Sequence, residues 1–205
     1  PAAAQVDAAE RSAPLIELVT FGRGDRVNEY FGHNAIVLSI PTAPARVVNY
    51  GMFSFGPDMI ARFLTGRLTF WVGETDFERT AAQYIAANRD VRLRRLNLEP
   101  EQRRAIARQL AHDVQPEHSH YLYDHYFDNC STRVRDVLDR ALHGQLRRAW
   151  SKPGRFTLRE LTRRYTQHDR VTEWLMMFGL NDRVDRPLQQ WDEVFLPDEL
   201  ELRID

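Results

Sequence analysis

The chain has 205 residues, 43% of them hydrophobic and 11% aromatic, which is enough to bury one substantial core in one domain. Its 28 basic and 29 acidic residues nearly cancel, so no broad positive field favours a nucleic acid as partner. No run reaches the roughly 20 apolar residues of a membrane-spanning helix, and no basic-then-apolar signal segment opens the chain.

The opening residues are small and polar without a sustained apolar period. This composition predicts a flexible tether over residues 1–13 and a single soluble domain over residues 14–205. The chain begins at Pro1 and not at a methionine, so both a removed signal peptide and an upstream membrane segment are compatible with it. The single cysteine, Cys130, excludes an internal disulfide.

Apolar runs bounded by turn residues predict that the sheet lies in the first half of the chain. Strands are expected at residues 15–22, 33–40, 46–52, 68–74 and 91–98. A hairpin is expected across the proline-bearing loop 41–45. In residues 33–40 both alternating sets contain apolar side chains, so we expect this strand to be central and covered on both faces.

Helical spacing and terminal signals predict helices between and after these strands. The helices expected before the cysteine are 57–66, 76–89 and 99–114, followed by an aromatic-rich link at 118–127. Another helix is expected from Asp128 or Asn129 to Gly144, and the C-terminal third is expected to be helical, with Pro153 and Pro187 as breaks.

Cys130 falls in the first turn of the helix that Asp128 or Asn129 caps. There the unpaired backbone N–H groups and the helix dipole stabilise a thiolate, which is the reactive form. One helical stripe is expected to face inward and the opposite face outward. The inward set is Cys130, Val134, Val137, Leu138 and Ala141, and the outward set is Arg133, Arg135 and Asp136. An inert buried cysteine is the alternative, but the polar run 128–132 favours a nucleophile.

Seven histidines compete for the role of general base. Those expected on helix surfaces or ends are His112, His143 and His168. Those that cluster in the link with Asp124 are His118, His120 and His125. Their spacing matches no standard zinc motif, so we expect no metal and no cofactor. His33 opens the predicted central strand and is our candidate base, with a hydrogen-bonded core histidine as the alternative.

Five motifs occur in order along the chain: FGHNA (31–35), VNYGMFSFG (48–56), GRLTFWVG (66–73), YFDNCSTRVRD (126–136) and PLQQWDEVFLP (187–197). Together they resemble the Lnb N-terminal periplasmic domain family, over about residues 15–200. That family is similar to circularly permuted papain-like domains of the NlpC/P60 and lecithin:retinol acyltransferase type. The resemblance implies an α+β fold, with an antiparallel sheet packed against a cysteine-bearing helix and extra C-terminal helices. In the permuted order the histidine strand precedes the cysteine helix, as His33 precedes Cys130.

The resemblance also implies a third polar residue that orients the imidazole. Asn49 is the candidate, with Glu29 as its rival. We expect Tyr121, Tyr123 and Tyr126 to shape the cleft beside the cysteine. Arg133 is a candidate contact for a phosphate or carboxylate, and a solvated arginine is the alternative. The residues predicted to contact substrate are Glu29, Tyr50, Tyr123, Tyr126, Asn129, Ser131 and Arg133.

The family association with envelope lipoproteins implies a periplasmic thiol acyltransferase, with tethering to the inner membrane by a segment outside this chain left open. Cys130 would take an acyl group from a phospholipid or lipoprotein as a thioester and pass it to an amine or to water. We expect a monomer with membrane-surface contact and no nucleic-acid partner. The alternatives are a papain-like peptidase or amidase of envelope peptides and a non-catalytic binding module.

A lipid substrate calls for apolar surface, and two stretches are candidates: residues 52–64 and 173–180. For both, packing into the core is the favoured interpretation, because aromatic and methionine side chains at such spacing usually face inward.

Overall fold

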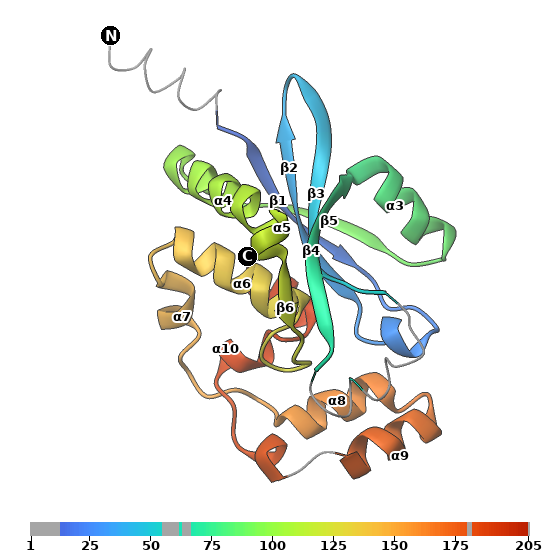
Figure 1. The fold of residues 1–205 in the computed structure, drawn as a ribbon. Coiled ribbons are helices and arrows are strands. Elements are labelled where there is room, and N and C mark those ends of the chain that lie inside the picture. Colours follow the sequence, from blue (N-terminus) through green and yellow to red (C-terminus); the bar gives the residue numbers. More distant parts are fainter. Residues whose placement is uncertain (1–12, 55–61, 63–66, 180–181, 205) are drawn as a thin grey trace.

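The computed structural model describes residues 13–54, 62, 67–179 and 182–204 (Figure 1). The fold is α+β, with six antiparallel strands in the order β5-β1-β2-β3-β4-β6. The strands are β1 (Leu15–Phe21), β2 (His33–Ile40), β3 (Ala43–Met52), β4 (Thr69–Asp76), β5 (Val91–Arg95) and β6 (His120–Leu122). Strand β2 is internal and its residues 34–37 are buried, which confirms the prediction of a covered central strand.

The strand predictions hold, except that β5 ends at Arg95 and not at residue 98, and two further corrections are needed. The loop expected at 41–45 is shorter, because β3 already begins at Ala43, which pairs with Ile40. The short strand β6 lies inside the segment predicted to be a link, where three residues are too few to show alternation. It pairs with the start of β4 and therefore extends the sheet beyond the first half of the chain. The helix predicted at 57–66 lies outside the described residues, apart from Arg62.

Helices cover both faces of the sheet (Figure 1). One face carries α3, and the other carries α4 and α6. The helices are α3 (Phe77–Ala86), α4 (Pro100–Asp113), α5 (Pro116–Ser119), α6 (Cys130–Ala141), α7 (Gln145–Ala149), α8 (Leu158–Thr166), α9 (Arg170–Gly179), α10 (Gln190–Glu193) and α11 (Pro197–Arg203). Two 3-10 turns, η1 (Val27–Glu29) and η2 (Asp182–Asp185), complete the described elements. No helix among the described residues is both long and apolar enough to cross a membrane.

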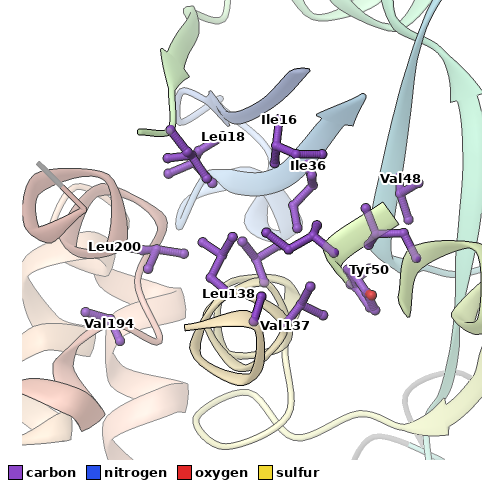
Figure 2. Packing of buried hydrophobic residues seen from close by; sticks show 14 of the residues in the cluster. Ile16, Leu18, Ile36, Val48, Tyr50, Val137, Leu138, Val194 and Leu200 are labelled. Atoms are coloured by element: carbon purple, nitrogen blue, oxygen red, sulfur yellow. The ribbon is translucent and has the colours of Figure 1, made fainter. Parts of the chain in front are cut away.

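The main core forms where α6 lies on the sheet. Val137 and Leu138 point from α6 toward Ile36 of β2 and its neighbours, and Leu200 of α11 closes the side (Figure 2). All four of these side chains are at most 1% exposed. The predicted inward stripe of α6 is therefore confirmed from Val134 to Ala141, although the helix ends at Ala141 and not at Gly144.

The predicted outward face of α6 needs one correction. Arg135 is buried, at 7% exposure, and its guanidinium lies 3.9 Å from the ring centroid of Trp191. It also donates to the Trp191 carbonyl at 3.0 Å. The spacing could not show this, because the cover comes from the C-terminal segment, which packs back over the helix.

The prediction that residues 173–180 pack into the core is wrong for the described part of that segment. Trp174, Leu175 and Phe178 of α9 are 63%, 57% and 80% exposed. Figure 1 places α8 and α9 beyond the end of the sheet, away from the core under α6. Exposed apolar side chains gathered on one helix commonly mark an interaction surface.

Candidate active site

The nucleophile candidate stands at the start of α6. Asn129 caps the helix: its Oδ1 accepts from the backbone N–H of Thr132 at 2.9 Å, and the Thr132 hydroxyl accepts from the Asn129 N–H at 2.8 Å. Cys130 is thus the first helical residue, as predicted, with Asn129 and not Asp128 as the cap. The Asn129 amide also donates to the Phe195 carbonyl at 2.9 Å, which fixes the helix start to the C-terminal segment. A thiolate at this position faces unpaired helix N–H groups.

A buried hydrogen-bond chain joins the helix start to the sheet. The Ser131 hydroxyl donates to Asn34 Oδ1 at 2.8 Å, and Asn34 Nδ2 donates to the Thr20 hydroxyl of β1 at 2.9 Å. These three residues are at most 1% exposed. Because Ser131 follows Cys130 and Asn34 follows His33, this clamp sets the distance between the thiol and the imidazole.

Cys130 and His33 are close enough for the thiol and the imidazole to change each other's pKa. Burial alone would raise the pKa of the Cys130 thiol, but the neighbouring imidazole, the Asn34 N–H and the Ser131 hydroxyl outweigh it and lower this pKa. Burial pulls the pKa of His33 down, yet the sulfur and the Asn49 amide outweigh that effect and raise it. Both shifts favour a thiolate beside an imidazolium, which is the activated form of a cysteine nucleophile.

Asn49 on β3 provides the third contact. Its Oδ1 lies 3.2 Å from Nε2 of His33, and the residue is 8% exposed. Since Nε2 contacts the amide, Nδ1 is the ring nitrogen available to the thiol. The rival candidate, Glu29, instead accepts from the Arg26 N–H at 3.3 Å and lies 3.6 Å from the guanidinium of Arg89. The geometry thus brings Asn49, and not Glu29, against the imidazole.

The space beside the sulfur is bounded by Gly51 and by aromatic rings. Gly51 has a φ of 100°, and a Cβ built on it would lie 3.7 Å from both Cys130 Cβ and the Tyr121 hydroxyl, and 3.8 Å from Phe70. A side chain at this position would be strained and would enter the space next to the thiol. Tyr123 stacks on Phe70 with ring centroids 4.2 Å apart, so the wall is aromatic.

The Tyr121 hydroxyl is buried and has no hydrogen-bond partner among the described residues. Burial, and secondarily the nearby sulfur, raise the pKa of Tyr121 well above its usual value, so the hydroxyl keeps its proton. A buried donor without a partner is costly unless something else binds it. Near a nucleophile, such a donor can accept the charge of an oxyanion.

The other residues predicted to contact substrate lie in several environments. Asn129 and Ser131 are buried and committed to the cap and the clamp described above. Tyr126 is hydrogen-bonded to Thr162 of α8 at 2.9 Å. Arg133 makes two hydrogen bonds to Asp128, at 2.6 and 2.9 Å. The sequence predicts these positions as substrate contacts, and the structure gives each of them a partner within the protein.

Arg133 also borders a polar cavity of about 340 Å³ on the outer side of α6. Tyr50 reaches this cavity, although only 1% of it is exposed, and its hydroxyl donates to Asp113 at 2.7 Å. The lining residues are Tyr50, Asp113, Phe127, Asp128, Arg133, Asp136 and Arg140. The guanidinium of Arg133 lies 3.6 Å from the centroid of the Tyr121 ring, so the cavity adjoins the wall beside the sulfur.

The histidines of the link segment have other surroundings. Burial lowers the pKa of His125 to about 4, so its imidazole is neutral at neutral pH. His118 stacks on His112 with ring centroids 4.0 Å apart. Within the described part of the chain, no three His, Cys, Asp or Glu side chains are grouped as metal ligands.

Three site features were missed by the sequence analysis. Asn34, Gly51 and Thr75 each adjoin a residue that it did single out, either in the chain or across the sheet. Asn34 could have been found as a polar residue directly before the apolar run 35–38 of a strand expected to be covered on both faces, since such a residue needs a buried partner. Gly51 interrupts β3 and so marks a close approach. Thr75 carried no signal.

In the comparison with known families, the model of the Lnb N-terminal periplasmic domain matches residues 5–164. No curated protein and no solved structure matches the chain. The matched region contains β1 to β6, the whole of α6 and the residues that surround Cys130.

Proposed function

The chain belongs to the Lnb N-terminal periplasmic domain family, and from this membership and the geometry around Cys130 we propose that it is a cysteine acyltransferase of the bacterial envelope. The observation that carries the proposal is the line of thiol, imidazole and amide from Cys130 through His33 to Asn49. The fold is then a circularly permuted papain-like domain, in which the histidine strand β2 precedes the cysteine helix α6.

In the first half-reaction, Nδ1 of His33 takes the thiol proton and the Cys130 sulfur attacks the ester carbonyl of a lipid. The carbonyl π electrons move to oxygen, and the oxyanion accepts hydrogen bonds from the Cys130 backbone N–H and the Tyr121 hydroxyl. When the intermediate collapses, the C–O bond breaks and His33 returns the proton to the leaving alcohol. The acyl group remains on sulfur as a thioester.

In the second half-reaction, an amine attacks the thioester carbonyl while His33 removes its proton. The C–S bond breaks, and the sulfur leaves as a thiolate that the imidazolium reprotonates. Water in place of the amine makes the same site a hydrolase. The aromatic wall of Phe70, Tyr121 and Tyr123 favours an acyl chain over a polar peptide next to the sulfur.

The exposed stripe of α9 supports a lipid source for the acyl group. Its apolar residues are Val171, Trp174, Leu175 and Phe178, spaced as one face of a helix and 57–80% exposed. Arg163 and Arg164 on α8 and Arg170 at the start of α9 are also exposed. Tryptophan, phenylalanine and leucine beside arginine are typical of helices that lie on an anionic phospholipid surface. We therefore assign the exposed apolar stripe of α9, with these arginines in the same part of the fold, to an anionic membrane surface.

The test is intact-protein mass spectrometry of the wild type, Cys130→Ala and His33→Ala after incubation with phospholipid vesicles. We expect a fatty-acyl mass increase that requires Cys130, falls strongly without His33, and is removed by hydroxylamine, which cleaves thioesters. No adduct, together with a thiol that is alkylated rapidly at neutral pH, would replace the acyltransferase with a papain-like peptidase or amidase. A thiol that is also unreactive would leave a binding module.

A further inference from the structure

The imidazole of His33 is connected to more than Asn49. Asn49 Nδ2 donates to the Thr75 hydroxyl of β4 at 3.2 Å, and this hydroxyl lies 2.9 Å from the hydroxyl of Thr80 in α3. The Thr80 hydroxyl donates to the backbone carbonyl of Asp76 at 2.7 Å. The chain of contacts thus runs on the α3 side of the sheet and ends at the residue that caps α3.

The direction of every hydrogen bond in this chain follows from its last member. A hydroxyl has one proton, and Thr80 gives its proton to the Asp76 carbonyl. Thr75 must therefore donate to Thr80, and its oxygen is left to accept from the Asn49 NH₂ group. This holds the amide with Oδ1 toward His33. Because an amide oxygen can only accept, Nε2 of the neutral imidazole must carry the ring proton.

We propose that Thr75 and Thr80 are positioning residues that select the imidazole tautomer with Nδ1 unprotonated. Only this tautomer can take the proton of the Cys130 thiol, since Nε2 faces Asn49. If the amide turned by 180°, its NH₂ group would face Nε2 and favour the tautomer that carries the proton on Nδ1. After that turn Thr75 would have to donate its proton to Asn49. Because Thr80 already donates its own proton to the Asp76 carbonyl, no proton would remain for the hydrogen bond between Thr75 and Thr80. The role of this tautomer in catalysis rests on the proposed function, whereas the tautomer itself follows from the hydrogen bonds alone.

Both threonines also have ordinary structural explanations. Thr75 stands near the end of β4, and a threonine in the first turn of a helix often bonds the carbonyl four residues before it, as Thr80 does with Asp76. Neither explanation requires contact with a functional amide. Removing the hydroxyl without changing the side-chain shape distinguishes the two roles. Only a positioning role predicts that the tautomer of the His33 imidazole then changes.

Thr75→Val and Thr80→Val are nearly isosteric and remove one hydroxyl each. The tautomer of His33 is read from its ring nitrogen shifts in ¹H–¹⁵N NMR spectra, with His33→Ala to identify the signal. We expect the wild type to hold the proton on Nε2, and Thr75→Val to show a mixture. Thr80→Val should also shift the tautomer toward a mixture, because Thr75 can then donate to Asn49. The shift should be smaller than in Thr75→Val, because the Thr75 hydroxyl can still accept from the Asn49 NH₂ group. Thr75→Ser keeps the hydroxyl and should restore the wild-type spectrum, whereas Thr69→Val, an exposed position on β4, should change nothing.

The second readout is the rate at which Cys130 is alkylated as a function of pH, which needs no substrate. The charged groups near His33 are the Cys130 sulfur and Arg89, and neither is altered by these substitutions. In Thr75→Val we expect the midpoint of the pH profile of Cys130 alkylation to rise by about one pH unit. At a pH well below this midpoint, alkylation should then be about tenfold slower. Unchanged tautomer and midpoint in Thr75→Val would overturn the inference while leaving the proposed function standing. A wild-type thiol with an ordinary midpoint would instead count against the proposed function, and the NMR result would still decide the tautomer.

Discussion

Helices α6 and α9 have the same spacing of apolar residues, but these residues are buried in α6 and exposed in α9. Both have apolar residues at the first, fourth, fifth and eighth positions of a stripe. In α6 these are Val134, Val137, Leu138 and Ala141, which are at most 8% exposed, and in α9 they are Val171, Trp174, Leu175 and Phe178, which are at least 57% exposed. The pattern identifies an amphipathic helix in each case. What covers the stripe is decided by the rest of the fold.

The difference follows from how each helix is attached. The apolar stripe of α6 lies against β2 and β3, with α4 and α11 at its sides. In contrast, α9 is held to α8 by polar contacts: Arg159 donates to the Met177 carbonyl at 3.0 Å, and Arg163 lies 3.3 Å from Glu173. Because these contacts use the other sides of α9, its apolar stripe faces outward. We infer that α6 positions the candidate active site and α9 presents a surface.

The largest expected effect compares one leucine from each helix. Leu138→Ala removes a side chain that is 1% exposed, and Leu175→Ala removes one that is 57% exposed. Leu138→Ala should lower the free energy of unfolding by about 2–5 kcal/mol, through lost burial and a residual cavity. Leu175→Ala should change it by about 0.5 kcal/mol or less. Urea denaturation of both variants measures the difference, and similar losses would mean that the stripe of α9 is buried in solution.

The next effect concerns the clamp at the start of α6. Ser131→Ala leaves the buried Oδ1 of Asn34 without its partner, which should cost about 1–3 kcal/mol of unfolding free energy. Alkylation of Cys130 at neutral pH should also slow, because the thiol and the imidazole lose their shared anchor. Ser151→Ala removes an exposed hydroxyl that donates to the Arg148 carbonyl at 2.8 Å and should be nearly neutral. If Ser131→Ala matched this control in both measurements, the clamp would have no positioning role.

A third prediction concerns pH. The imidazole of His33 lowers the pKa of the Cys130 thiol against the effect of burial, so the wild-type thiol should be alkylated with a midpoint below the ordinary value of about 8.5. In His33→Ala burial acts without that opposition, so the midpoint should rise above the ordinary value, by about one to two units in total. Phe178→Ala, on α9, should keep the wild-type midpoint. Equal midpoints in the wild type and His33→Ala would contradict the assignment of His33 as base.

The sequence predicted the sheet well because each strand carries its own signal. Strand β2 was found with its bounds, since apolar residues on both alternating sets are a property of the strand itself. Strand β6 was missed because its three residues are ordered by pairing with β4, which no local pattern encodes. The burial of Arg135 was missed for the same reason, because its cover is supplied by Trp191, far along the chain.

In the candidate site, too, some residues could be predicted from the local sequence and others could not. Cys130 could be placed in a first helical turn from its cap, and that placement is confirmed. The residue beside the imidazole could only be narrowed to Asn49 or Glu29, because the choice depends on which strands pair and in what register. Thr75 could not be predicted at all, since its contact with Asn49 arises from the pairing of β3 with β4. Local chemistry is readable from the sequence, whereas contacts across the sheet require the fold.

The smallest expected effect is on the surface of α9. Trp174 is 63% exposed, whereas Trp150 and Trp191 are 7% and 6% exposed, so transfer of Trp174 into a lipid interface should shift the fluorescence emission to shorter wavelength. Adding vesicles that contain anionic phospholipid should produce this shift, and Phe178→Ala should weaken vesicle binding about fivefold to tenfold, as expected for the partial loss of one buried ring. Ile85→Ala is the matched control, because Ile85 is 63% exposed on α3 and lies outside the stripe. A shift that depends on protein concentration and not on lipid would assign the stripe to a second copy of the chain. Equal loss in both variants would show that binding does not use α9, and the contrast with α6 would then reflect only incomplete burial.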